Sequence, residues 1–405
     1  MEISILILIS FLLILAYIFD ISSAFTRVPS VILLLLLGWG VRQAAVNLAI
    51  TVPDLAFLLP ILGTIGLILI VLEGALELEI NRSKISIINK AFLLALVPMV
   101  IVALIIATVI NYYELADFKT SLLNAIPFCV ISSAVAIPSV RSLHKRTKEL
   151  VVYESSFSDI IGVLFFNFIA LNQVIDSETF LGFGYQLLMI VGVSFISILL
   201  LSFLLSRNSH HVTYAPIILL VILIYALSKQ FHLPGLIFIL VFGLFLGNLE
   251  ELRHFKWFEV FKPAKFEKEV EKFKDITAEV TFLVRALFFI LFGYLMETEE
   301  LLNLETLPWA TGIVSLIILI RWFILKVFYL PVKDLLFIAP RGLITILLFL
   351  SIVPDQGIPF INKSIVIQTI VLSVIIMMTG LMFIQKPGKK PLNQQYMEEV
   401  FTGEE

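Results

Sequence analysis

Long apolar runs follow one another along most of this 405-residue chain, and short polar stretches separate them. A helix needs about 20 consecutive apolar residues to cross a bilayer, and most of these runs reach that length. The pattern therefore predicts an all-α polytopic membrane protein with about 13 transmembrane helices. Their approximate ranges are 3–19, 30–50, 54–76, 91–110, 121–140, 150–171, 181–206, 213–229, 234–249, 277–296, 308–330, 333–353 and 362–385.

Composition supports the membrane class. Apolar residues make up 60% of the chain, charged residues only 15%, and the mean hydropathy is +1.05. A net charge of −3 gives no basis for binding nucleic acid. The single cysteine, Cys129, excludes an intramolecular disulfide. The first residues lack the basic region of a signal peptide, so the run at 3–19 is expected to be a retained span.

Lysines and arginines are distributed unevenly between the two sets of loops that thirteen spans would create. Most of the 28 lie in loops on the C-terminal side. The exceptions are Lys119, Lys229 and Lys363 in the opposite loops, and Arg42, Arg285, Arg321 and Arg341 inside spans. Because positive loops stay in the cytoplasm, the N-terminus is expected outside the plasma membrane and the C-terminus in the cytoplasm.

Two motifs occur twice and in the same order. The prolines at Pro29 and Pro234 are each followed nine residues later by a glycine, and the stretches 72–77 and 291–297 resemble each other. These matches relate the second span to the ninth and the third to the tenth. An offset of seven spans is odd, so the two halves would insert with opposite topology, as in transporter inverted repeats. Chance recurrence of proline and glycine is the alternative.

The repeat also relates the fifth span to the twelfth, and both contain helix-breaking sequences. The fifth holds Ile-Ser-Ser-Ala-Val-Ala-Ile-Pro at 131–138, and the twelfth holds Ala-Pro-Arg-Gly at 339–342. Proline removes a helical hydrogen bond, and hydroxyls or an arginine can serve the freed backbone groups. Paired broken spans in the two halves are a strong sequence pointer to a transport site.

The sixth span carries two carboxylates and three serine hydroxyls within Tyr-Glu-Ser-Ser-Phe-Ser-Asp at 153–159. A charge near the bilayer centre costs about 3 kcal/mol or more, so it usually marks an ion or proton path. On a helix, Ser155 and Asp159 share one face, and Glu154 and Ser158 share a neighbouring face. One face can hold a cation while the other holds a structural partner.

Aromatic residues alternate with charges in the segment 250–275 on the basic side. This pattern predicts a cytoplasmic loop. It is either an interfacial helix that gates or regulates, or a basic connector that lies on lipid headgroups.

These motifs resemble the sodium/proton exchanger branch of the monovalent cation/proton antiporter superfamily. The branch carries a Glu-Ser-x-x-Asn-Asp run in its sixth span, matched by 154–159, and a Phe-Glu-Gly-Gly-Leu run, matched by 72–76. It also has an arginine matched by Arg321 and an Arg-Gly motif matched by Arg341 and Gly342. The resemblance covers nearly the whole chain, in order and at compatible spacing.

The sequence departs from the family pattern at three points. The family has a Thr-Asp-Pro motif in its fifth span, but this chain has Ser132 and Ser133 there, so that aspartate is missing. Ser158 replaces the asparagine before the last aspartate, and Arg285 is an additional cation in the tenth span.

Asp159 is the expected carrier carboxylate. Exchange needs one group that holds either a proton or a cation, and burial disfavours the charged form enough for the two to compete. Hard cations take oxygen ligands, which makes Ser155, one turn away, the next candidate and Ser158 a weaker one. The resemblance adds the freed backbone near Ser132 and Ser133. The alternatives are a structural carboxylate held by an arginine, and serines bonded back to their own helix.

The resemblance implies structural or charge-balancing roles for the other charged residues. It pairs Glu154 with Arg321, although Arg321 could instead neutralise Asp159. It places Glu73 on the cytoplasmic approach to the ion, where the alternative is a span-end charge that reaches water. Arg341 is expected to cap carbonyls of a broken helix or to balance the charge of the site. Arg285 has no role in the family, and pairing with a span carboxylate or snorkelling is expected.

The resemblance further implies a division into moving and static helices and a homodimer in the lipid bilayer. The expected parts are scaffold helices at 1–89, core helices at 90–172, a linker helix and scaffold at 173–307, core helices at 308–386 and a cytoplasmic tail at 387–405.

The expected function is electroneutral exchange of one monovalent cation, Na⁺ before Li⁺ or K⁺, for one proton. One carboxylate is neutral with either ligand, so both crossing states carry the same charge. No cofactor and no enzymatic activity are expected, because nucleophile, nucleotide and metal motifs are lacking. The alternatives are a transport-inactive ion or pH sensor and a cation channel.

Overall fold

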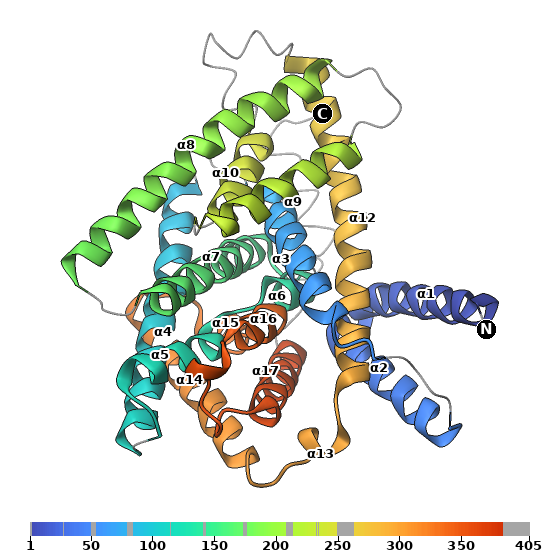
Figure 1. Ribbon diagram of the computed structural model, residues 1–405, viewed down its shortest axis with the longest axis vertical. Helices are drawn as coiled ribbons and strands as arrows, with labels where there is room; N and C mark the ends of the chain where they lie inside the picture. The colour runs from blue at the N-terminus through green and yellow to red at the C-terminus, as the bar shows by residue number, and fades with distance from the viewer. Residues whose placement is uncertain are drawn as a thin grey trace, which may run out of the picture.

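A computed structural model describes residues 2–26, 28–49, 54–78, 84–113, 115–140, 143–172, 176–207, 214–231, 233, 235–248 and 263–383. Every regular element in these ranges is helical (Figure 1). The helices of the first half are α1 (Glu2–Thr26), α2 (Ser30–Asn47), α3 (Leu58–Glu77), α4 (Ile85–Tyr112), α5 (Phe118–Cys129), α6 (Ser133–Ser139) and α7 (Lys145–Leu171).

The second half begins with α8 (Ser177–Arg207), α9 (Tyr214–Gln230) and α10 (Gly235–Gly247). It continues with α12 (Pro263–Leu295), α13 (Thr298–Leu301), α14 (Leu307–Val327), α15 (Val332–Leu335), α16 (Leu343–Ser351), the short 3₁₀ turn η3 (Pro354–Gln356) and α17 (Lys363–Phe383). Each of the thirteen apolar segments predicted from the sequence coincides with one of these helices or with a broken pair. Within the described residues, nine helical segments are long and apolar enough to cross a membrane, and one of them is the broken pair α5 and α6.

One boundary differs from the prediction. Residues 263–275, expected in a loop, form the first turns of α12, while 250–262 lie outside the described residues. Val270 and Phe273 are buried, and Phe273 packs against Tyr214 of α9. Val270 and Phe273 therefore lie on the inner face of a helix. At 33 residues, α12 is about 50 Å long, which exceeds the hydrocarbon thickness of about 30 Å.

The two broken spans are confirmed. The fifth span consists of α5 and α6, separated by extended residues, and the twelfth consists of α15 and α16. The Ser132 N–H donates to the Pro340 carbonyl at 2.9 Å, so the two interruptions meet. Asp117 caps the start of α5 by accepting from the backbone of Lys119 and Thr120. The broken helices lie in the middle of the molecule, with α7 beside them (Figure 1).

Helix packing reproduces the internal repeat. Helix α2, the second span, packs against α12, the tenth span, and α10, the ninth span, packs against α3, the third span. These two pairs are equivalent if the ninth span repeats the second and the tenth repeats the third. The repeated glycines lie at these crossings. A Cβ added at Gly38 would lie 2.0 Å from the Ile290 carbonyl oxygen, and one at Gly243 would lie 2.5 Å from the Ala75 Cβ. Only glycine permits such close approach of two helices.

Replacing Gly38 with alanine is expected to lower the stability of the folded protein by about 1–3 kcal/mol, because the new methyl group overpacks a backbone contact. Gly40 on the same helix is a matched control, because a Cβ there meets nothing within 4 Å. Gly40→Ala should be neutral or slightly stabilising. Thermal unfolding of the purified variants in detergent measures both, and equal melting temperatures would contradict this packing.

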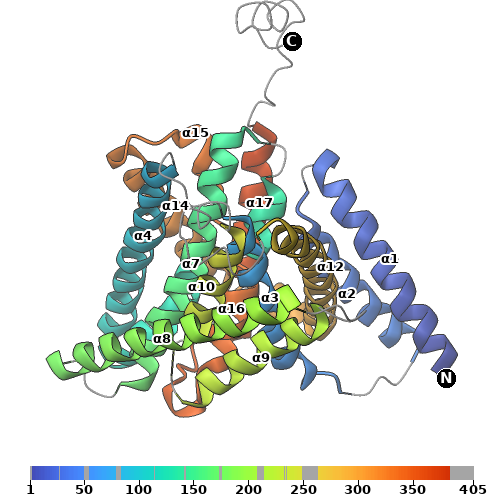
Figure 2. The same cartoon turned by 90° about the horizontal axis from the view of Figure 1, so that it is seen from above.

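A second view separates the helices into two groups that flank α3, α7 and α10 (Figure 2). Helices α4 and α14 lie at one edge, and α1, α2 and α12 lie at the other edge in both views (Figure 1, Figure 2). Helix α3 contacts α6, α7 and α16, and α1 and α2 also contact α6.

Candidate functional site

The candidate site lies where the two broken spans cross and α7 passes beside them. The interruption at 130–132 leaves extended backbone between α5 and α6, and residues 336–342 separate α15 from α16. A Cβ added at Gly342 would lie 2.8 Å from a Val135 methyl carbon and 2.9 Å from the Ser132 Oγ. The absence of a side chain at Gly342 therefore lets the two interrupted segments cross closely.

Asp159 projects from α7 into this crossing and is only 1% exposed. Its Oδ2 accepts from the Ser133 N–H at 3.3 Å and from the Ser133 hydroxyl. Its Oδ1 has no hydrogen-bond partner among the described residues. The carboxylate is thus held by one oxygen at the start of α6, and the other oxygen is available for a ligand.

Ser158 and Ser155, the two predicted serine ligands on α7, already make hydrogen bonds. The Ser158 Oγ accepts from the Ile131 N–H at 2.8 Å, which satisfies a backbone group freed by the break in the fifth span. The Ser155 hydroxyl donates to the Val152 carbonyl at 3.3 Å. Ser158 therefore fixes the extended segment, whereas Ser155 bonds back to its own helix and its oxygen lone pairs can still accept.

Five buried hydroxyls have no hydrogen-bond partner in the described part of the chain, and two of them belong to Ser132 and Ser156. Ser132 belongs to the crossing itself. Ser156 lies one turn before Asp159 on α7 and faces α3, where a Cβ on Gly74 would be 3.1 Å from its Oγ. Sequence reasoning did not select Ser156. The available signal was its position three residues before Asp159, which places both on neighbouring turns of one helix side.

Glu73 lies on α3 next to Gly74 and is half-buried. Because Gly74 faces Ser156, this part of α3 lies against α7 close to the Asp159 turn. Glu73 lies in the same turn of α3 as Gly74, near the C-terminal end of the helix.

Glu154 and Arg321 form the predicted ion pair. The two terminal nitrogens of Arg321 each donate to one oxygen of Glu154, in a forked arrangement, and both side chains are at most 2% exposed. The Arg321 Nε donates to the Leu335 carbonyl at 2.9 Å, at the end of α15. No ion pair joins Arg321 to Asp159 among the described residues. This geometry disfavours the alternative in which Arg321 neutralises Asp159.

Arg341 caps carbonyls at the ends of broken helices, as one of the two sequence interpretations expected. It is 2% exposed, and its Nε donates to the Phe128 carbonyl at 2.6 Å. Its terminal nitrogens donate to the carbonyls of Ala339 at 2.7 Å and Cys129 at 3.4 Å. The carbonyl end of a helix carries partial negative charge, so the end of α5 stabilises this buried cation.

Arg285, the additional cation, pairs with a span carboxylate. Its guanidinium lies 3.8 Å from the Asp20 carboxylate of α1, which also accepts from the Ser30 hydroxyl at 3.2 Å. This pair joins α1, α2 and α12 and lies outside the Asp159 crossing.

The arrangement can bind a small hard cation. The Asp159 carboxylate and the hydroxyls of Ser132, Ser133 and Ser158 lie at the crossing, and such oxygens are the ligands that hard cations prefer. In the described residues, no group of three or more His, Cys, Asp or Glu side chains forms a site for a transition metal. Arg321 donates to Glu154, and Arg341 donates to backbone carbonyls. In the described part of the chain, the Asp159 Oδ1 therefore remains without a hydrogen-bond partner and can accept a ligand.

Comparisons with known proteins agree with this architecture. No curated protein matches the sequence. Among solved structures, the sodium proton antiporter MjNhaP1 from Methanocaldococcus jannaschii at pH 8 is 20% identical, with a TM-score of 0.66 over 96% of this chain and 100% of that chain. An electron-microscopy structure of the same antiporter is 18% identical, with a TM-score of 0.64 over 100% and 98% of the two chains. At these identities the likeness establishes the fold.

The family assignment rests on the sequence. The model of the transmembrane sodium/hydrogen exchanger family matches residues 8–385, which include every candidate residue described above. The resemblance first seen in the motifs is thereby confirmed, and the chain belongs to the sodium/hydrogen exchanger family.

Proposed function

We propose that this protein exchanges Na⁺ for H⁺ across a membrane by alternating access, with Asp159 holding either ligand. The observation that carries the proposal is the buried Asp159 carboxylate, which has one free oxygen and no arginine partner in the described residues. Family membership and the fold shared with a sodium proton antiporter support the same chemistry.

The cation ligands are proposed to be Asp159 Oδ1 together with the hydroxyls of Ser155, Ser156 and Ser132. Ser133 and Ser158 act as positioning residues, because the first donates to Asp159 and the second accepts from Ile131. Na⁺ and a proton then compete for one carboxylate. The Na⁺ concentration that gives half-maximal exchange should therefore rise as the pH falls.

Exchange is proposed to be electroneutral, with one Na⁺ for one H⁺. Asp159 is uncharged overall with either ligand, while the Glu154–Arg321 pair stays closed. The helices that carry the crossing, α4 to α7 and α14 to α17, form the moving core, and α1, α2, α3, α8, α9, α10 and α12 form the static scaffold. We also propose a homodimer through the scaffold, residence in the plasma membrane, and a cytoplasmic face on the basic side.

Flux through proteoliposomes with a trapped pH dye tests the proposal. An inward Na⁺ gradient should alkalinise the lumen, and a membrane potential set with K⁺ and valinomycin should leave the rate unchanged. Li⁺ and K⁺ gradients in parallel establish the cation preference. Absence of Na⁺-driven alkalinisation would contradict the exchanger, and a rate that follows the membrane potential would contradict the stoichiometry.

The sensor alternative retains one specific observation in its favour. Ser133 stands where the family carries an aspartate, and its hydroxyl donates to Asp159. A sensor would bind Na⁺ to the purified protein without flux, so the same proteoliposomes together with a binding isotherm separate the two functions.

Ser156→Ala is expected to raise the Na⁺ concentration for half-maximal flux about fivefold, as loss of one interaction of about 1 kcal/mol would do. The maximal rate should change little, because Asp159 still carries the proton. Ser194→Ala is the matched control, since the buried Ser194 hydroxyl bonds only its own helix on α8, at 2.6 Å from the Ile190 carbonyl. An unchanged Na⁺ dependence in Ser156→Ala would remove Ser156 from the ligand set.

A further inference from the structure

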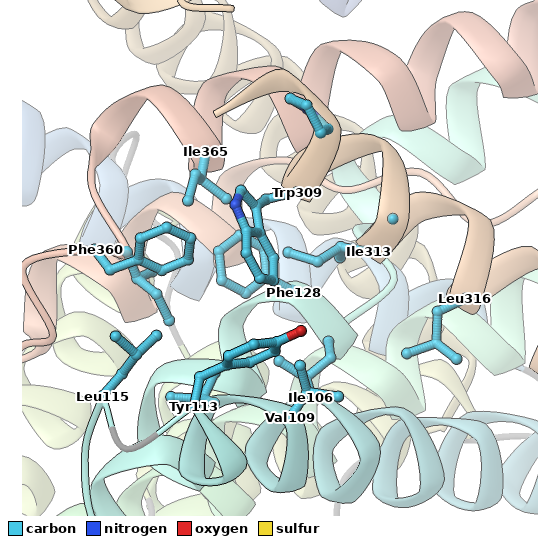
Figure 3. Close-up of a pocket in the computed structure, with 14 residues that line it drawn as sticks. Ile106, Val109, Tyr113, Leu115, Phe128, Trp309, Ile313, Leu316, Phe360 and Ile365 are labelled. Atoms are coloured by element: carbon cyan, nitrogen blue, oxygen red, sulfur yellow. The ribbon is translucent and has the colours of Figure 1, made fainter. Parts of the chain in front are cut away.

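A separate cavity of about 430 Å³ lies between α4, α14 and the segment that leads into α17. Its walls consist of side chains such as Ile106, Ile313, Leu316 and Ile365, with Phe128 at the end of α5 (Figure 3). The lining is almost entirely carbon, and the volume lies within the range of about 300–1,000 Å³ that small-molecule sites occupy. The cavity does not include Asp159 or any proposed ion ligand.

Aromatic side chains form the rim of this cavity. The Trp309 ring meets Phe360 edge-on at 4.9 Å and Tyr113 edge-on at 6.0 Å between centroids. Tyr113 is 60% exposed and Trp309 is 37% exposed. Trp and Tyr are enriched where a membrane meets water, so this rim is placed at the headgroup level of the leaflet opposite the basic loops.

Hydrogen bonds hold the walls in place. The Asn124 side chain of α5 donates to the Gln356 carbonyl at 2.8 Å, and the Gln368 side chain of α17 accepts from the Thr306 hydroxyl at 2.9 Å. These bonds tie α5, α14 and α17 together on this side. The cavity is therefore formed before any ligand binds, which lowers the entropic cost of ordering its walls on binding.

We propose that this cavity is a binding site for one acyl chain of a membrane phospholipid, whose headgroup stays at the Trp309–Tyr113 rim. The cavity lies between α4 and α14, at the edge of the molecule away from α1 and α12 (Figure 1, Figure 2). In a membrane, the apolar molecules that surround this edge are lipids. The residues that line the cavity contribute no charged side chain. A hydrocarbon chain therefore suits the cavity, whereas a charged solute would be buried there without a partner.

Occupancy by the acyl chain stabilises the transport core. Phe128 forms one wall, and its carbonyl accepts the 2.6 Å hydrogen bond from Arg341. A ligand that binds the folded protein and not the unfolded chain raises the melting temperature. Phospholipid added to delipidated protein should therefore raise the melting temperature through this cavity.

Gly312 offers a way to fill the cavity without disturbing its walls. It lines the cavity, and a Cβ built there meets nothing within 4 Å. Leucine at this position would occupy the space of the acyl chain and would favour the helix. Gly182 on α8 is the matched control, because it is also an open glycine and does not line the cavity.

The test uses the delipidated full-length protein in detergent, titrated with a phospholipid that carries a photoreactive diazirine in one acyl chain. Saturable labelling of peptides 106–115 and 308–316, and a rise in melting temperature, are expected in the wild type and in Gly182→Leu. Both should be lost in Gly312→Leu, and Ile313→Trp fills the same cavity as a second variant. The proposal is overturned by labelling that stays proportional to lipid concentration, by equal labelling of Gly312→Leu, or by displacement with free fatty acid but not with phospholipid.

Discussion

Asp159→Asn is expected to abolish Na⁺-dependent proton flux, leaving only the leak of protein-free liposomes. The asparagine side chain has nearly the same shape, so it can still accept from Ser133. An amide, however, neither takes up a proton in this pH range nor neutralises a bound cation. Both half-reactions of the exchange fail together, and the loss should persist at every pH and Na⁺ concentration.

The matched control for this variant is Asp117→Asn. Asp117 caps α5 by accepting from the Lys119 and Thr120 backbone, and asparagine caps helices about as well as aspartate. Flux should survive in this control. Measurable Na⁺-driven alkalinisation in Asp159→Asn, with the protein folded and inserted, would mean that another group carries the proton.

Glu154→Ala and Arg321→Ala are each expected to destabilise the protein by about 3–5 kcal/mol, because each leaves an uncompensated charge in the bilayer interior. The two single variants should lose a similar amount of stability, because both break the same ion pair. A double variant, Glu154→Met with Arg321→Met, should recover much of the stability, since an apolar pair replaces a buried ion pair at little cost. Thermal unfolding of the wild type, Glu154→Met, Arg321→Met and the double methionine variant forms a double-mutant cycle that measures the coupling.

The Arg42–Glu297 pair provides the comparison. Its charged atoms are 3.1 Å apart, but the side chains are 29% and 56% exposed. An exposed pair contributes about 0–1 kcal/mol, so Arg42→Ala should change the melting temperature far less than Arg321→Ala. If Glu154→Ala were as stable as the wild type and yet inactive, Glu154 would have a role in the transport chemistry instead of a structural role.

The features that could be predicted from the sequence depend on a local motif or on the spacing of residues along the chain. Proline and glycine spacing predicted the repeat, and the structure places Gly38 and Gly243 at equivalent helix crossings. The interruptions near Ser132 and Pro340 followed from helix-breaking residues, and they meet through a backbone hydrogen bond. The Glu154–Arg321 pair followed from the family resemblance and is present.

Features that depend on which helices are neighbours could not be predicted. Ser158 was a weaker candidate for an ion ligand, and the sequence could not show that its hydroxyl accepts from the Ile131 N–H, which becomes available only where the fifth span breaks. Ser156 was passed over because its importance depends on the way Gly74 of α3 lies against α7. Asp20 could not be assigned to Arg285, because nothing in the sequence says that α1 and α12 are in contact.

The start of α12 was misplaced for a related reason. Charges at 263–275 made that segment look like a loop, although Val270 and Phe273 pack inward at helical spacing. An amphipathic helix that extends a span beyond the bilayer has the composition of a loop, and only its periodicity distinguishes the two.

The central claim is that Na⁺ and a proton share the Asp159 carboxylate, and proton release on Na⁺ binding tests it most directly. Purified protein in weakly buffered detergent solution is titrated with NaCl while a pH dye reports released protons and a binding isotherm reports bound Na⁺. Choline chloride controls for ionic strength. At a pH where the site is protonated, we predict one proton released for each Na⁺ bound, and neither binding nor release in Asp159→Asn. Na⁺ binding without proton release, or equal release from Asp159→Asn, would contradict the shared carboxylate.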